Sequence, residues 1–205
     1  MARNPNTPEQ VAEVRTELLD VAQQLYEQDG PEAMSFRSIA NLAGCSHTKP
    51  YSYFDSKADI IDALRIRAYE WLLGVLTTAA ASQDRPLDAM QALAEAYIRA
   101  GLERPRMYEL LYTDQGSLDE TDERLLQAKL AALDVCRRTI EAAADAGDVE
   151  LAADPLTAAH AFWAGAHGLV QLEHGGFLVV ERSVDDLVPV VVAALLRGLT
   201  TEVPS

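Results

Sequence analysis

Apolar residues recur every three or four positions along almost the whole chain, and stretches that alternate apolar with polar residues are nearly absent. The first spacing places apolar side chains on one face of an α-helix, whereas a half-buried strand needs strict alternation. With 205 residues the chain is long enough to bury a hydrophobic core. The pattern therefore predicts an all-α fold of about nine helices.

Local capping signals set the expected helix boundaries in the N-terminal part. The segment Thr7-Pro8-Glu9-Gln10 combines a capping residue, a proline at the first helical position and Gln three residues after the cap. Ser35 and Ser46 are expected to cap two short helices, the second ending near Phe54. Gly44, in the turn between them, suits a left-handed conformation.

Similar signals mark the later helices. Ser56 resembles the first residue of a capping box and opens a long helix over 57–81. Another capping-box pattern lies at Ser117-Leu118-Asp119-Glu120, and Asp154-Pro155 starts the next helix. Asp186 is expected to cap the last helix, with Pro189 in its first turn, where a missing N–H breaks no bond.

Two short helices joined by a three-residue turn that contains glycine form a helix-turn-helix pattern. This spacing alone is weak evidence, since many helical hairpins share it. The second helix is, however, too polar for a core helix. Donor-bearing side chains of modest length at a helix N-terminus suit the major groove of DNA. Within seven positions this helix carries His47, Thr48, Lys49, Tyr51, Ser52 and Tyr53.

The distribution of charge is compatible with DNA binding by one end of the chain. The net charge of −15 argues against nucleic acid, because neutralising phosphates requires Lys and Arg. Residues 35–57, however, hold Arg37, Lys49 and Lys57 against Asp55 alone, a net charge of +2. Residues 58–205 hold 12 Lys and Arg against 24 Asp and Glu. We therefore expect weak binding to nonspecific DNA.

The stretch from Ser35 to Lys57, SFRSIANLAGCSHTKPYSYFDSK, strongly resembles the DNA-binding domain of the TetR family of bacterial repressors. The similarity begins with Leu18, Ala22, Leu25 and Gly30 and runs to about residue 64. It implies DNA-contacting roles for ten residues. Arg37 would reach a base edge, and His47, Thr48, Lys49 and Ser52 would face the groove; Ser46, at the start of that helix, is also expected to contact DNA. Ser35, Tyr51, Tyr53 and Lys57 would lie at phosphates, the last helped by the helix dipole.

Two residues depart from the family pattern. Pro50 stands where the family usually has Leu, and Lys49 where it often has Thr. Because proline lacks an N–H, Pro50 removes a hydrogen bond at or near the start of this helix. The recognition helix is therefore expected to start late or to be tighter than usual.

The last helix favours dimerisation. It is apolar on nearly all sides, so it has to bury more than one face. One face can cover the chain's own core, and the other needs a partner. A twofold homodimer would present two recognition helices to successive major grooves and read a palindromic operator. The expected interface consists of Leu187, Val188, Val191, Leu195 and Leu199.

An interrupted helix around Pro105 is expected to form a pocket wall, because it leaves unfilled volume between longer helices. Ordinary core packing is an equally good interpretation. The pattern Trp163-Ala-Gly-Ala-His167-Gly168 resembles a Trp-x-x-x-His-Gly signature of one subgroup of TetR ligand-binding domains. A small, largely hydrophobic ligand is expected. The candidate ligand-binding residues are Trp71, Tyr97, Met107, Tyr108, Leu111, Tyr112, Trp163 and His167.

Three histidines recur every seven residues, at His160, His167 and His174. Seven residues span about 10.5 Å of helix rise, so one ion cannot bridge them without other ligands. A role in packing or at a subunit interface is favoured, and neither a metal nor a cofactor is expected. The two cysteines, Cys45 and Cys136, have no metal-type spacing and indicate a reducing cytoplasm.

Other classes of function remain open. An enzyme is disfavoured, because the chain has no glycine-rich phosphate loop or nucleophile elbow. A repressor without a ligand is a second alternative, although the large second domain argues against it. Activation of transcription is also possible. No apolar run reaches the length of a membrane span. We expect a DNA-binding domain at 7–56, extended by the start of the long helix at 57–81, and a ligand-binding and dimerisation domain at 57–205.

Overall fold

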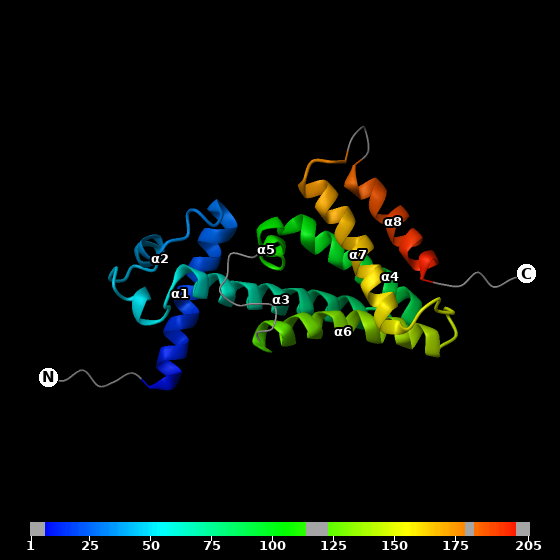
Figure 1. Ribbon diagram of the computed structural model, residues 1–205, viewed down its shortest axis with the longest axis horizontal. Coiled ribbons are helices and arrows are strands. Elements are labelled where there is room, and N and C mark those ends of the chain that lie inside the picture. Colours follow the sequence, from blue (N-terminus) through cyan, green and yellow to red (C-terminus); the bar gives the residue numbers. More distant parts are fainter. Residues whose placement is uncertain (1–6, 114–122, 179–182, 200–205) are drawn as a thin grey trace, which may run out of the picture. The chain divides into compact units, whose positions relative to one another are not determined.

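The computed structural model describes residues 7–113, 123–178 and 183–199, and every regular element in these ranges is helical (Figure 1). The expected all-α fold is confirmed. Eight α-helices and one three-residue 3₁₀ helix stand where about nine helices were expected. They are α1 Pro8–Asp29, α2 Phe36–Leu42, η1 Pro50–Ser52, α3 Lys57–Ala81, α4 Pro86–Glu103, α5 Pro105–Leu110, α6 Glu123–Asp145, α7 Pro155–His174 and α8 Val184–Gly198.

The helices divide into two compact units. The first contains residues up to Ala68 together with Arg106–Leu125, and the second contains Tyr69–Pro105 and residues from Leu126 onward. The chain crosses between the units within α3, after Pro105 and within α6. All three crossings lie within helices, the second directly after the first residue of α5.

The helix starts follow the capping signals closely. Thr7 and Gln10 form the expected capping box of α1, which ends at Gly30 with φ of 83°. Ser35 caps α2 and accepts a hydrogen bond from the Ser38 amide at 3.1 Å. Asp154 caps α7. These starts were predictable because each depends on residues two or three positions apart.

The expected start of the last helix was wrong. Ser183, not Asp186, is the N-cap of α8, and its hydroxyl accepts from the Asp186 amide at 3.2 Å. Asp186 instead closes the capping box from the third helical position, where its carboxylate accepts from the Ser183 amide at 3.1 Å. Pro189 consequently lies inside α8. The other predicted capping box, at residues 117–120, falls outside the described residues.

The first unit closes around one side of α1. Its core is apolar, and α2, the start of α3 and the short helix α5 all contribute to it. The largest buried side chains include Leu18, Tyr26, Met34, Ile39, Phe54, Ile60, Leu64 and Met107. Burial raises the pKa of the Tyr26 hydroxyl to about 12, with the Glu109 carboxylate adding to the effect. The unit therefore has an apolar core of its own.

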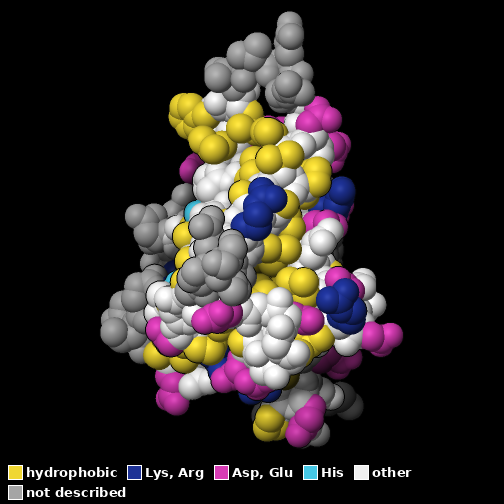
Figure 2. All heavy atoms as spheres, turned by 90° about the vertical axis from the view of Figure 1, so that its right-hand side faces the viewer, with side chains coloured by type: hydrophobic (Ala, Val, Ile, Leu, Met, Phe, Trp, Pro, Cys, Tyr) yellow, Lys and Arg dark blue, Asp and Glu magenta, His cyan; other side chains and the backbone are white. Residues whose placement is uncertain are grey.

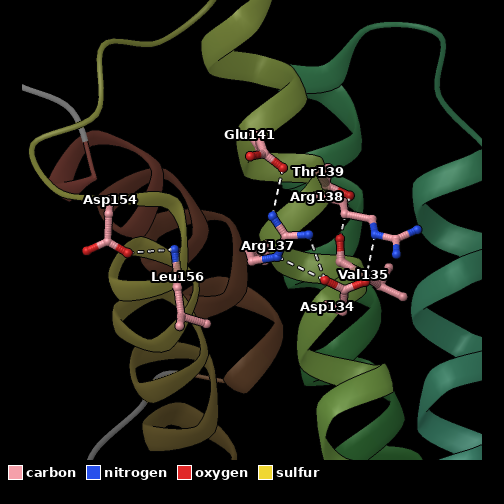
Figure 3. Close-up of polar contacts among 8 residues, drawn as sticks. All are labelled: Asp134, Val135, Arg137, Arg138, Thr139, Glu141, Asp154 and Leu156. Carbon is pink, nitrogen blue, oxygen red and sulfur yellow. Dashed lines mark hydrogen bonds and ion pairs between the residues drawn. The ribbon is translucent and has the colours of Figure 1, made fainter.

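In the second unit α4, α7 and α8 contact one another (Figure 1). Gly165 of α7 lies against the Leu195 side chain of α8, so there is no room for a Cβ unless that side chain moves. The side of α6 drawn in Figure 3 carries ion pairs three or four residues apart. Arg137 contacts Asp134 at 2.8 Å and Glu141 at 2.7 Å. Pairs at this spacing stabilise a solvated helix face.

Candidate nucleic-acid interface

The turn between α2 and the polar stretch has the expected geometry. Gly44 adopts φ of 63°, the left-handed region that glycine enters without steric cost. The Cys45 amide donates to the Ala40 carbonyl at 3.0 Å and closes the turn. Residues 46–54, here called the recognition segment, therefore leave α2 at a sharply defined angle.

The recognition segment is not the α-helix expected from Ser46 to Phe54. Its only regular element is η1, in which the Ser52 amide donates to the Lys49 carbonyl at 3.0 Å. Proline at position 50 has no N–H to donate to Ser46, so the Lys49 amide takes that carbonyl at 2.9 Å, three residues away. The expected tightening is thus confirmed. The expected cap by Ser46 is wrong, since its hydroxyl lies 3.3 Å from that of Thr48.

Most of the predicted DNA-contacting side chains are accessible. Lys49, Tyr53 and Lys57 are half-buried, and the exposed ones are Ser35, Arg37, Ser46, His47, Thr48, Tyr51 and Ser52. Pro50 and Phe54 point the other way, into the core of the first unit. Pro50 and Phe54 therefore hold the recognition segment against the core of the first unit, while its donor-bearing side chains remain accessible to solvent.

Two predicted phosphate contacts already have partners within the chain. The Tyr51 ring, 64% exposed, stacks on Phe36 of α2 with centroids 4.2 Å apart and planes 8° apart. The Lys57 ammonium donates to the Pro31 carbonyl at 2.5 Å. An ammonium has three donors, so one bond to Pro31 leaves others for a second acceptor.

Sequence reasoning missed Arg15. From the middle of α1 its guanidinium donates to the Tyr53 carbonyl, at the end of the recognition segment. It also pairs with Asp59 of α3 at 3.1 Å and lies over the Phe54 ring at 4.2 Å. A lone arginine beside the apolar stripe of α1 was the available signal. Its partners lie 38 to 44 residues away and could not be inferred from spacing.

The eight candidate ligand-binding residues divide between the two units. In the second unit the Trp163 indole N–H donates to the Tyr97 hydroxyl at 2.8 Å, and the His167 ring lies 6.4 Å from the Trp163 ring. Burial, and next the nearby His174, lowers the pKa of His167. Trp71 lies under the Arg104 guanidinium at 5.1 Å. Met107, Tyr108, Leu111 and Tyr112 belong to the first unit.

The three regularly spaced histidines make separate contacts. The His160 Nδ1 lies 2.9 Å from the Leu156 carbonyl, and His174 Nε2 lies 3.1 Å from the Gly101 carbonyl. A carbonyl oxygen can only accept, so His160 Nδ1 and His174 Nε2 are the donors of these two hydrogen bonds. Among the described residues no three His, Cys, Asp or Glu side chains are grouped as metal ligands would be. No helix within those ranges is both long and apolar enough to cross a bilayer.

The predicted interface residues lie on two sides of α8. Val188 and Leu199 are buried within the chain itself, whereas Leu187, Val191 and Leu195 are half-buried. The outward face adds Val190, which is 62% exposed. Figure 2 shows hydrophobic side chains gathered over this part of the second unit.

Comparison with known proteins covers both parts of the chain. Residues 18–64 match the family described as "Bacterial regulatory proteins, tetR family", and residues 90–195 match the "Tetracyclin repressor-like, C-terminal domain". The HTH-type transcriptional repressor KstR2 of Mycolicibacterium smegmatis is 29% identical over 111 residues, 54% of each chain. The chain thus aligns with about half the length of the curated relatives that it matches.

Solved structures match over nearly the whole chain. A protein of unknown function from Rhodococcus sp. RHA1 superposes with a TM-score of 0.81 at 27% identity, covering 97% of this chain and 100% of that one. FadR from Bacillus subtilis, solved in complex with stearoyl-CoA, has a TM-score of 0.70 at 13% identity, over 90% and 98% of the two chains. The second likeness is one of fold alone. With both its helix-turn-helix part and its C-terminal part matched, the chain belongs to the TetR family of bacterial regulatory proteins.

Proposed function

We propose that this chain is a transcriptional repressor that binds a palindromic DNA operator as a homodimer and is released by a small, largely hydrophobic ligand. The observation that carries the proposal is the recognition segment. It exposes hydroxyl and imidazole donors, and it lies within residues 35–57, which carry a net charge of +2 in an otherwise acidic chain. Phosphate and base recognition require such groups. The similarity to KstR2, itself a repressor, favours repression over activation.

The proposed contacts divide into two kinds. Arg37, exposed in the first turn of α2, would read a base edge, and His47, Thr48, Lys49 and Ser52 of the recognition segment would face the groove. Ser35, Tyr51, Tyr53 and Lys57 would hold phosphates. In this division residues 7–56 act as the DNA-binding domain, extended by the start of the long helix at 57–81. Residues 57–205 act as the ligand-binding and dimerisation domain.

Dimerisation is proposed through α7 and α8. The outward face of α8 combines Val190 with the half-buried Leu187 and Val191. On α7 the neighbouring exposed apolar side chains include Leu172. Large apolar side chains on two adjacent helices favour a partner surface of the same kind, which a twofold dimer supplies.

For the ligand we propose a mainly apolar molecule with a polar group near the Trp163–Tyr97 pair, as the Trp-x-x-x-His-Gly pattern suggests. Trp163 is 36% exposed, its N–H is held by the Tyr97 hydroxyl, and the His167 ring lies 6.4 Å from its own, so apolar and polar groups meet at this position. The FadR structure shows that a related helical fold accommodates stearoyl-CoA, a molecule with a long acyl chain. We propose no enzymatic reaction, and we propose the cytoplasm as the location, because bacterial DNA lies there.

The connections between the two units support a route from ligand to DNA. At the crossing after Pro105, Arg104 lies over Trp71 in the second unit. Two residues later, Arg106 lies beside Gly30, at the C-terminal end of α1, in the first unit. A ligand that displaces Trp71 or the end of α4 therefore acts close in sequence to a residue that contacts α1.

Selection of bound duplexes from a random pool tests the proposed function. A twofold dimer repeats its contacts on two half-sites, so the enriched sequence should be a near-palindrome. Enrichment of only asymmetric sequences would contradict the dimer. Catalytic turnover by a variant carrying both Arg37→Ala and Lys49→Ala, with full retention of that activity, would favour an enzyme instead.

A further inference from the structure

The recognition segment has little internal structure to hold its side chains in place. Its three-residue 3₁₀ helix follows a proline, and the Tyr53 and Phe54 amides share the Pro50 carbonyl, each at 3.0 Å. Short 3₁₀ helices have poorer hydrogen-bond geometry than α-helices. Reading base edges requires side chains held in a fixed register, so contacts from outside the segment have to supply the rigidity.

Arg15 supplies two such contacts at one end of the segment and a third to the start of α3. One terminal nitrogen donates to the Tyr53 carbonyl, which follows η1. The other pairs with the Asp59 carboxylate at 3.1 Å, and the guanidinium covers the Phe54 ring at 4.2 Å. A planar guanidinium can bond in two directions and stack at once, whereas a lysine ammonium cannot.

Asp59 extends this link into α3. Its second carboxylate oxygen accepts from the Asp55 amide at 3.2 Å, and its own amide donates to the Ser56 hydroxyl at 3.1 Å. Both bonds lie in the short connection between the recognition segment and α3. Arg15 and Asp59 therefore tie α1, the end of the segment and the start of α3 into one network of charge-assisted hydrogen bonds, which are stronger than neutral ones.

The geometry does not place Arg15 at a phosphate. Two of its five N–H donors are bonded within the chain, the guanidinium lies over the Phe54 ring, and the side chain is only 35% exposed, so its planar group is already oriented toward the protein. We infer that Arg15 is a positioning residue for DNA reading: it fixes the recognition segment against α1 and α3 without touching DNA. This inference rests on the proposed function, since it assigns Arg15 a role in sequence-specific binding.

The test compares Arg15→Ala and Arg15→Lys with Arg67→Ala. Arg67 makes the matched control, because it also joins α3 to α1, through Asp20 at 2.6 Å and Gln23 at 3.3 Å, both outside the recognition segment. Each protein is titrated with the duplex that the unaltered protein enriches from a random pool, and with mixed-sequence DNA, over a range of salt concentrations. Thermal unfolding of each variant establishes the folded fraction to which affinities are referred.

We expect Arg15→Ala to weaken binding of the enriched duplex about 10- to 100-fold, the loss of one or two charge-assisted hydrogen bonds. Affinity for mixed-sequence DNA should change less than about twofold, and the salt dependence should keep its slope. The affinity of Arg15→Lys for the enriched duplex should lie between that of Arg15→Ala and that of the unaltered protein. Arg67→Ala should bind as the unaltered protein does. Equal losses on both DNAs with a slope reduced by about one would instead make Arg15 a phosphate contact and overturn the inference.

Hydrogen exchange of the DNA-free protein gives a second readout that does not depend on an operator. The amides of Ser52, Tyr53 and Phe54 should exchange faster in Arg15→Ala than in Arg67→Ala. Equal exchange in the two variants, or unchanged affinity for the enriched duplex, would overturn the positioning role. If the unaltered protein enriched no duplex, the proposed DNA-binding function would fail, while the exchange rates would still decide whether Arg15 holds the segment.

Discussion

Single residues decide the shape of the DNA-facing surface. Pro50 removes one N–H and converts the expected helix into a 3₁₀ turn, and this effect could be anticipated because it depends on one residue and its neighbour four positions back. The role of Arg15 could not be anticipated. Periodicity identifies which face of α1 is apolar, but not which side chain of a distant segment lies beside its edge.

At the scale of single residues, Arg37→Ala should change the sequence preference of binding, whereas Lys57→Ala should change the affinity for all sequences. Loss of Arg37 should cost ~1–3 kcal/mol of binding free energy and relax the preference at one base pair. Loss of Lys57 should weaken all sequences about equally and reduce the salt slope by about one. Affinity measurements on a set of single-base operator variants distinguish the two. Reversed profiles would show that the division into base and phosphate contacts is wrong.

The start of a helix depends on capping hydrogen bonds between residues that are close in the sequence. The starts of α1, α2 and α7 were predictable, since a cap and its acceptor or donor lie within three residues. The start of α8 was not, because Ser183 and Asp186 are both competent caps three residues apart. The structure uses Ser183 as the cap and Asp186 as its reciprocal partner.

The cap of α7 should give a pH-dependent stability. The Thr157 hydroxyl, and then the Thr157 amide, lower the pKa of Asp154, which also accepts from the Leu156 amide at 3.1 Å (Figure 3). A lowered folded-state pKa means that the stabilisation is present above the unfolded pKa, about 3.9, and is lost as the pH falls through the folded value. Asp154→Ala should therefore lower the Tm at pH 7, and the difference should shrink below about pH 4.

Differential scanning calorimetry at several pH values measures this difference. Asp154→Asn is the control, because an asparagine oxygen can still accept from the two amides but carries no charge to titrate. At pH 7 the Tm of Asp154→Asn should lie closer to that of the unaltered protein than the Tm of Asp154→Ala does. Identical Tm values for the alanine variant and the unaltered protein at that pH would show that the cap does not stabilise α7.

At the scale of the whole molecule, the sequence predicted the class of each part better than the arrangement of its residues. The helix-turn-helix followed from the spacing together with the polar residues after the turn and the family resemblance, and the last helix from its apolar residues. The predicted ligand residues, in contrast, divide between two units, and the Trp163–Tyr97 hydrogen bond joins residues 66 positions apart. Spacing within a helix carries no information on which helices meet.

The proposed dimer predicts the behaviour of Val190→Asp. Val190 is largely exposed in the single chain, so the substitution should leave the helices folded. At an apolar contact between chains, an unpaired carboxylate costs several kcal/mol, so the protein should become monomeric. Light scattering measures the mass, and circular dichroism the helix content. Val11→Asp, at an exposed position of α1, is the control; a dimer that survives Val190→Asp would exclude this face of α8.

The proposed switch predicts reciprocal coupling between ligand and operator. A coupling of ~1–3 kcal/mol would reduce operator affinity roughly 5- to 150-fold, and the operator must weaken ligand binding by the same factor. Fluorescence anisotropy with a labelled operator, with and without a compound shown by calorimetry to bind, measures it. Unchanged operator affinity at saturating compound would leave a protein whose two sites are uncoupled.

The stack of Tyr51 on Phe36 has a consequence for the entropy of binding. An exposed tyrosine normally samples several rotamers, and ordering such a side chain at an interface costs about 0.5–1.5 kcal/mol. Here the ring is already confined against a neighbour 4.2 Å away before any DNA arrives. In the proposed complex the Tyr51 hydroxyl would hold a phosphate with that rotational freedom already lost, so the contact would need little further ordering of the side chain.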